Sequence, residues 1–206
     1  TVSGSGTYVG GVCGYNSTHS TLEKSYNTGT VSGANTVGGV CGYNDNTVNG
    51  CYNIGGVSST SGNNVGGVCG KNEEGGTVSN CYYLDTIANA FGNGNGTNCE
   101  SKTEVAFKNG EVAYLLQQAI GTNDPVWGQS LGKNASPVLA WQDDYQPVYS
   151  KDPQSTCNAP YCNTPGVLDH DYTTDGVCRR CGYVAEVTPS SDGYYEIHNL
   201  GQLYWF

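Results

Sequence analysis

The sequence predicts a mainly β protein that opens with a short β-solenoid, a parallel β-helix-like stack of repeated units. Two observations carry this prediction: a six-residue string recurs at constant spacing, and the composition suits strands and tight turns. Among 206 residues, 31 are glycine and only 13% are charged, while 16 tyrosines supply large apolar surfaces. Glycine at this density weakens helices, whereas Val, Thr and Tyr favour strands joined by turns rich in Asn, Gly and Ser.

The recurring string is Val-Gly-Gly-Val-Cys-Gly, here called the sextet. It occupies residues 9–14, 37–42 and 65–70, so that its cysteines stand 28 residues apart. A unit of this length cannot bury its own apolar side chains, but stacked units can, with each residue lying over its equivalent at the strand spacing of about 4.8 Å. Of the two alternating faces of the sextet, we expect Val40 and its flanking glycines to point inward.

Cysteines also recur in the repeats and just after them: Cys13, Cys41, Cys51, Cys69, Cys81 and Cys99. A stacked cysteine is a good small hydrophobic residue. Disulfides between columns, such as Cys51 with Cys81, are the alternative, because neighbouring repeats bring such residues near disulfide distance. A metal or reactive role is disfavoured, since no histidine or carboxylate recurs in register with them.

The pattern Val-Gly-Gly-Val-Cys-Gly-Tyr-Asn, followed by Cys-Tyr-Asn-x-Gly, resembles the GLUG repeat of bacterial surface and secreted proteins. The resemblance covers roughly residues 1–84. It implies a repeat architecture and an extracellular or bacterial cell-surface location. In that family the repeats accompany enzymes rather than act as enzymes, so the resemblance brings no catalytic function.

Residues 85–150 predict a small α+β segment that caps the open end of the repeats. Phe91–Asn98 is rich in Gly and Asn and predicts a loop. Ser101 and Glu104 form a capping-box pattern that opens a helical piece, Gly110 interrupts it, and Glu111–Ile120 continues with apolar residues on one face. Strands are expected around residues 138–141 and 148–149. A stack end exposes unpaired strand edges, which a helix could cover.

Residues 151–190 predict a small module stapled by cysteine and histidine. The candidate metal ligands are Cys157, Cys162, His170, Cys178 and Cys181. A Cys-x-x-Cys knuckle followed by glycine resembles half of a zinc-ribbon site, and zinc takes four such ligands. The five candidates exceed that number, so the ligand set stays open. The alternatives are structural zinc or two disulfides, the second being common in secreted proteins. Residues 191–206 resemble the start of a further domain, truncated at the chain end.

The net charge of the chain argues against some classes of binding partner. With a net charge of −10, the chain lacks the clustered Lys and Arg that nucleic acids require. No stretch approaches the roughly 20 apolar residues of a membrane span, so no membrane insertion is expected in this fragment. We expect contacts with other domains of the same surface protein, and with a glycan or host surface ligand if the chain binds one.

The sequence thus predicts a non-catalytic structural or adhesive repeat region, an adhesin-like part of a bacterial cell-surface or secreted protein. The alternative is a carbohydrate- or host-ligand-binding module attached to a larger secreted enzyme, because tyrosines on a rigid sheet can stack on sugar rings. The candidates for that stacking are Tyr15, Tyr43, Tyr26 and Tyr52. We expect no enzyme, because no nucleophile motif, phosphate loop or convergent pair of carboxylates is present.

Overall fold

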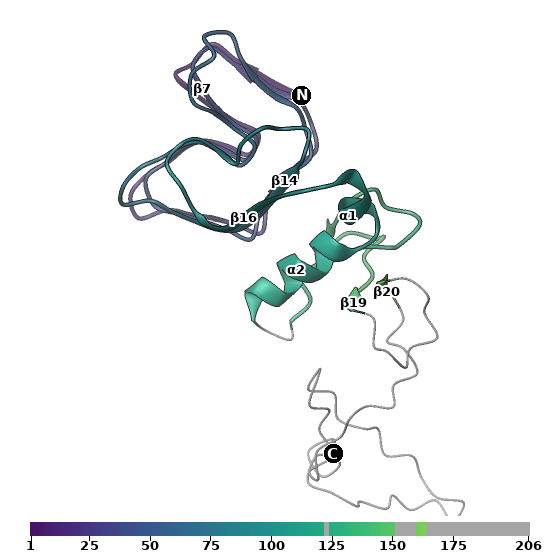
Figure 1. Cartoon of the computed structure of the whole chain (residues 1–206). Coiled ribbons are helices and arrows are strands. Elements are labelled where there is room, and N and C mark those ends of the chain that lie inside the picture. Colours follow the sequence, from purple (N-terminus) through teal and green to yellow (C-terminus); the bar gives the residue numbers. More distant parts are fainter. Residues whose placement is uncertain (122–123, 151–159, 164–206) are drawn as a thin grey trace, which may run out of the picture. The chain divides into compact units, whose positions relative to one another are not determined.

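The computed structural model describes residues 1–121, 124–150 and 160–163, all of which lie in one compact unit. This unit is mainly β, and its parallel sheets combine equivalent strands of successive repeats, an arrangement compatible with a β-helix-like repeat. Figure 1 looks along the stack, where the repeats superpose. We call residues 2–102 the repeat stack, and its repeats are β1–β5, β6–β10 and β11–β14, followed by a partial fourth repeat, β15–β16.

The described residues of the stack form four parallel sheets. Sheet A contains β1 (Val2–Gly4), β6 (Val31–Gly33) and β11 (Val57–Ser59). Sheet B contains β2 (Tyr8–Gly10), β7 (Thr36–Gly38) and β12 (Val65–Gly66). Sheet C contains β3 (Cys13–Asn16), β8 (Cys41–Asn44), β13 (Cys69–Asn72) and β15 (Phe91–Asn93). Sheet D contains β4 (Thr21–Glu23), β5 (Tyr26–Asn27), β9 (Thr47–Asn49), β10 (Tyr52–Asn53), β14 (Thr77–Leu84) and β16 (Thr97–Lys102).

The strands pair in the register that the sequence predicts. Val37 lies between Val9 and Val65, and Cys41 lies between Cys13 and Cys69, so the 28-residue spacing places each residue on its equivalent. The loops absorb differences in repeat length, because the strand pairs of sheet D keep Tyr on Tyr at other spacings. The partial fourth repeat extends sheet pairing to Lys102, so Phe91–Asn98, predicted as a loop, instead contributes to β15 and β16.

The sextet is a corner rather than one strand. In the second repeat, β7 ends at Gly38 and β8 begins at Cys41, with a bend between them. Side chains therefore do not alternate between two faces across the sextet. Val40 is buried as predicted, but Val37 and Cys41 are fully buried too. Val37 belongs to the core of sheets A and B, whereas Val40 and Cys41 belong to a separate core between sheets C and D.

The sextet glycines allow sheets B and C to touch through their backbones. A Cβ on Gly42 would lie 2.7 Å from the Val9 nitrogen, and a Cβ on Gly70 would lie 2.8 Å from the Val37 nitrogen. No side chain fits at such distances, so glycine is required by close approach. The contact pinches each repeat into two loops with separate cores, visible in Figure 1 with β7 on one loop and β14 on the other.

A ladder of asparagine side chains crosses the repeats beside the second core. The Asn16 amide donates to Asn44 Oδ1 and the Asn44 amide donates to Asn72 Oδ1, each at 2.7 Å, and the Asn72 amide donates to the Asn95 carbonyl at 2.8 Å. A shorter ladder links Asn27 to Asn53 in sheet D at 2.7 Å. These bonds satisfy polar groups that the stack buries.

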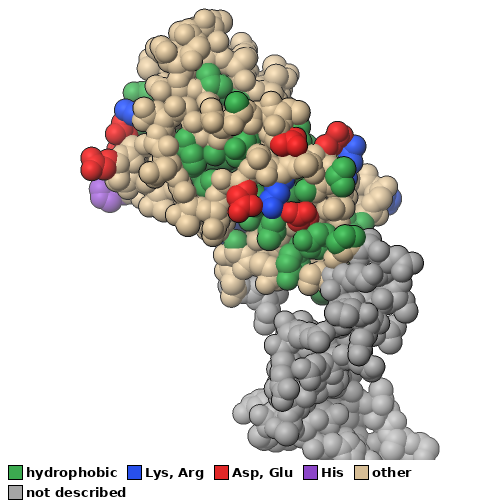
Figure 2. All heavy atoms as spheres, viewed as in Figure 1, with side chains coloured by type: hydrophobic (Ala, Val, Ile, Leu, Met, Phe, Trp, Pro, Cys, Tyr) green, Lys and Arg blue, Asp and Glu red, His purple; other side chains and the backbone are tan. Residues whose placement is uncertain are grey.

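Two helices pack on the outward face of sheet D. They are α1 (Glu104–Lys108) and α2 (Glu111–Ile120), the second with the bounds predicted from sequence. Their apolar side chains, with Trp127, enclose Tyr52 and Tyr82 in a third core. This contact lies on a flank of the stack, so it gives no support to a cap over the stack end. Lys102 of β16 pairs with Glu111 of α2 at 3.0 Å. Figure 2 shows that acidic and basic side chains lie beside one another on this face of the molecule.

The start of α1 differs from the predicted capping box at Ser101. Thr103 is the N-cap, and its hydroxyl accepts a hydrogen bond from the Ala106 nitrogen, because Ser101 still belongs to β16. The strands that follow α2 are short: β17 (Trp127–Gly128), β18 (Val138–Leu139), β19 (Tyr149–Ser150) and β20 (Tyr161–Cys162). Neither helix of the described ranges has the length and apolar character to cross a membrane.

Candidate functional site

Three tyrosine rings form a surface cluster at the junction of sheets B and C, here called the tyrosine cluster. Tyr8 comes from β2, Tyr15 from β3 and Tyr43 from β8. Ring centroids lie 4.6 Å apart for Tyr8 and Tyr43, 5.2 Å for Tyr15 and Tyr43, and 5.8 Å for Tyr8 and Tyr15. Tyr8 and Tyr15 remain 41% and 49% exposed. The cluster is therefore a continuous aromatic surface that contacts solvent.

Charged side chains are fixed beside this surface. Lys71 stands over the Tyr43 ring, with Nζ 5.4 Å from its centroid, and forms an ion pair with Glu73. The Tyr43 hydroxyl donates to Glu73 Oε1 at 2.5 Å. The ion pair with Lys71, followed by the bond from Tyr43, lowers the pKa of Glu73, and the bond to Glu73 raises the pKa of Tyr43. Glu73 is thus held as a carboxylate, with Lys71 protonated, at the edge of the rings.

The four tyrosines predicted to stack on sugars separate into two groups. Tyr15 and Tyr43 lie in the tyrosine cluster. Tyr26 and Tyr52 stack on each other with centroids 5.0 Å apart, and both rings contact Trp127. Tyr52 is fully buried and donates its hydroxyl hydrogen bond to the Pro137 carbonyl at 2.6 Å. The prediction for Tyr52 as a ligand contact is therefore wrong, because its ring is buried beneath the segment that follows the repeats. Tyr26 is only half-buried, so its role as a ligand contact stays a prediction.

Sequence reasoning missed Tyr8. The equivalent residues in the next repeats are Thr36 and Asn64, so no ladder draws attention to the position. A signal was present nonetheless, because Tyr8 directly precedes the sextet and Tyr15 directly follows it. Only the corner and the backbone contact between sheets B and C bring the two rings onto one surface.

The cysteines form two stacked columns. Cys13, Cys41 and Cys69 line sheet C, and Cys81 pairs in register with Cys99 in sheet D, with Cys51 one repeat before Cys81 in the same column. All six are free thiols, which agrees with the stacked-hydrophobe interpretation. The proposed Cys51–Cys81 disulfide is not formed. Burial raises the pKa of the Cys81 thiol and keeps it neutral inside the core.

The predicted metal cluster falls largely outside the described residues. Of its five candidate ligands, only Cys162 in β20 is described, and it is disulfide-bonded. Cys157, His170, Cys178 and Cys181 lie outside the described ranges. The residues that the structure does describe contain no group of three His, Cys, Asp or Glu side chains able to hold a metal ion. Zinc and disulfides both remain predictions for residues 151–190, and metal analysis of the purified chain with a free-thiol count would distinguish them.

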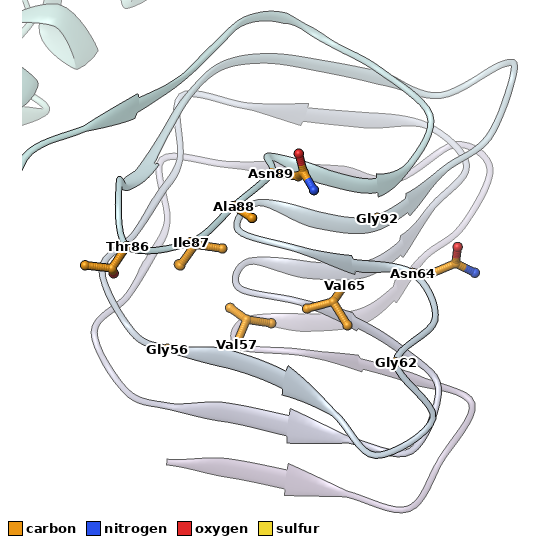
Figure 3. A pocket seen from close by; sticks show the side chains of 10 residues that line it. All are labelled: Gly56, Val57, Gly62, Asn64, Val65, Thr86, Ile87, Ala88, Asn89 and Gly92. Carbon is orange, nitrogen blue, oxygen red and sulfur yellow. The ribbon is translucent and has the colours of Figure 1, made fainter.

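A hollow of about 490 Å³ lies beyond the last strands of sheets A and B. In Figure 3, Val57, Val65 and Ile87 point into it, whereas Asn64 stands at its edge. It marks the place where β11 and β12 are outermost in their sheets, because the partial fourth repeat pairs only with sheets C and D. None of its lining residues carries an acid or a base, so the hollow offers no chemistry for general acid or base catalysis.

One comparison with known proteins identifies a motif in the first repeat. The sequence model of the GLUG motif matches residues 5–32, which run from before β2 into β6. The chain thus carries a GLUG motif, and this motif indicates a repeat region of a surface or secreted protein. Neither the curated proteins nor the solved structures gave a match.

Proposed function

We propose that this chain is a non-catalytic scaffold of an extracellular or cell-surface protein, in which a β-solenoid presents surface residues to a partner. Its neighbours would be other domains of the same protein. The observation that carries the proposal is the in-register stacking of identical residues. Most of the sextet valines and cysteines are buried in the cores, and the recurring asparagines bond to one another in ladders.

The division between repeated and unrepeated positions supports a scaffold. Repeated residues are mostly small and apolar or are bonded to their own equivalents, so they describe how repeats attach to one another. Outward positions differ from repeat to repeat, as in the series Tyr15, Tyr43 and Lys71 of sheet C. A solenoid can change such positions at little cost to stability, because they contribute little to the interfaces between repeats.

A tandem duplication tests the solenoid. Inserting a second copy of residues 9–36 after Thr36 adds one 28-residue period. The inserted copy then lies next to the second repeat, where it can make the contacts with the helical segment that the first repeat makes in the original chain. The variant should unfold cooperatively, with a larger denaturant m-value and a higher free energy of unfolding, since one more interface is formed. The matched control inserts only residues 9–22, half a period, and should be destabilised. If the full-period insertion destabilises the chain as much as the half-period one, the solenoid is refuted.

Protease treatment of intact cells tests the location. Cells that produce the protein naturally are exposed to proteinase K and blotted with antibodies against this chain. Loss of the signal from intact cells, with a cytosolic marker preserved, is the expected result. A signal that survives until the cells are lysed, together with none in the culture medium, would contradict an extracellular scaffold.

A further inference from the structure

We propose that the tyrosine cluster is a binding site for a neutral saccharide, whose sugar rings stack on Tyr8 and Tyr15. This inference goes beyond the scaffold function and does not depend on the cellular location. It starts from exposure: Tyr8 and Tyr15 are large rings that stay 41% and 49% exposed although they pack against each other and Tyr43. Tyrosine exposes an apolar face together with a hydroxyl that bonds to polar groups, as an amphipathic sugar requires.

The rings of the tyrosine cluster leave exposed aromatic surface but form no cage around a cation. Ring centroids 4.6–5.8 Å apart mean that the tyrosines contact one another and leave no cage between them. A cation would need to sit over an open ring face, and the Lys71 ammonium already stands over Tyr43. Tyr8 and Tyr15 stack with their planes 29° apart, and both rings keep exposed aromatic surface, here called the platform. The C–H face of a sugar ring can pack on such exposed aromatic surface.

The polar groups beside the platform match sugar hydroxyls. Glu73 presents a carboxylate held by Lys71 and the Tyr43 hydroxyl, so an acceptor and a donor lie together at the platform edge. These groups are already oriented by their mutual bonds, which lowers the entropy cost of binding a ligand. In sheet C, Tyr15, Tyr43 and Lys71 occupy equivalent outward positions in three successive repeats. The aromatic rings therefore lie in the first two repeats, and the charged partner lies in the third.

The local charge excludes anionic ligands. Glu73 and Asp45 act on the Tyr43 ring, against one ammonium from Lys71, so the platform edge is acidic overall. The whole chain carries a net charge of −10. An acidic polysaccharide or a nucleic acid would be repelled, whereas a neutral saccharide would not.

Affinity gel electrophoresis of the full chain tests the proposal. The probes cast into the gel are dextran, galactomannan, xyloglucan and mixed-linkage β-glucan, with polygalacturonate as the anionic polymer and a titration with N-acetylglucosamine hexamer in solution. We expect at least one neutral probe to retard or bind the chain and polygalacturonate to have no effect. Replacing Tyr8 and Tyr15 together by Ala should weaken that binding at least about tenfold.

Matched variants separate stacking from folding. Tyr15→Phe keeps the ring and should retain most of the binding, whereas Tyr15→Leu keeps an apolar side chain without the ring and should lose it. Trp141 is 79% exposed and lies outside the cluster, so Trp141→Ala should bind like the original chain. Circular dichroism establishes that each variant is folded. The proposal is overturned if no neutral probe binds, or if Tyr15→Leu binds as well as Tyr15→Phe.

Discussion

Replacing Asn44 by alanine should show how much the asparagine ladder contributes to stability. Asn44 is fully buried, and its three short side-chain hydrogen bonds are the one it accepts from Asn16 at 2.7 Å and those it donates to Asn72 Oδ1 at 2.7 Å and to the Asn46 carbonyl at 2.9 Å. Two longer bonds join its side chain to the Thr77 carbonyl and the Asn46 nitrogen. At about 1 kcal/mol per bond, the loss is about 3 kcal/mol. The Asn16 amide keeps its bond to the Thr47 carbonyl, so it is not orphaned. Asn72 Oδ1 loses the hydrogen bond that Asn44 donates to it, so the substitution leaves this acceptor without its ladder partner. The expected loss of stability is therefore not reduced below about 3 kcal/mol, or about 1 kcal/mol per bond.

The assay is equilibrium urea unfolding followed by circular dichroism and tryptophan fluorescence. Asn44→Ala should lower the free energy of unfolding by about 3 kcal/mol with an unchanged m-value. The matched control is Asn63→Ala, an asparagine on the exposed turn before β12, which should change the free energy by less than about 0.5 kcal/mol. A loss below about 1 kcal/mol for Asn44→Ala would refute the reasoning, because the ladder would then contribute no more than a single surface contact.

Three further predictions address the glycines, the buried tyrosines and the cysteines. Gly38→Ala should destabilise the chain by more than about 2 kcal/mol in the same assay, because its Cβ would lie 2.7 Å from a backbone nitrogen. Gly75→Ala, with open space around its Cβ, should change little, and equal effects at both positions would contradict the requirement for close approach. Burial raises the pKa of Tyr82 to about 12, so the folded state favours the neutral phenol. The stability that Tyr82 gains from staying neutral is complete below the unfolded pKa of about 10 and is lost as pH rises towards 12. The free energy of unfolding should therefore fall less between pH 9 and 11.5 in Tyr82→Phe than in the original chain. An equal fall in both proteins would contradict the prediction. In a native alkylation experiment read by mass spectrometry, half-buried Cys13 should react with iodoacetamide, whereas fully buried Cys69 should react only on unfolding; equal rates would argue against the buried column.

The repeat register could be predicted because identity at constant spacing leaves one way to stack the units. Val9, Val37 and Val65 lie over one another as the sequence requires, and α2 keeps its predicted bounds because Gly110 and Gly121 flank a clear apolar pattern. In both cases the signal is local or periodic. The partial fourth repeat was missed because it lacks a sextet, although Cys99 carries a trace of the cysteine column.

The corner of the sextet and the position of the helices could not be predicted. A string of glycine, valine and cysteine has no polar residue to mark a face, so alternation was a reasonable but wrong assumption between Val37 and Cys41. The helical segment has an apolar face that suits a stack end as well as a flank. The outward apolar face that Tyr52 and Tyr82 form on sheet D places the helices on the flank. The orientation of these two tyrosines is known only once the register of sheet D is known.

The tyrosine cluster follows from the same glycines that make the repeats stack. Gly42 allows sheet C to approach the backbone of Val9 in sheet B, and this approach brings Tyr8 within 4.6 Å of Tyr43, 35 positions later in the chain. Residues that recur therefore build the surface, while residues that differ between repeats determine what it presents. A protein of this kind can change its partner without changing its fold, because the outward residues of sheet C are independent of the ladders beneath them.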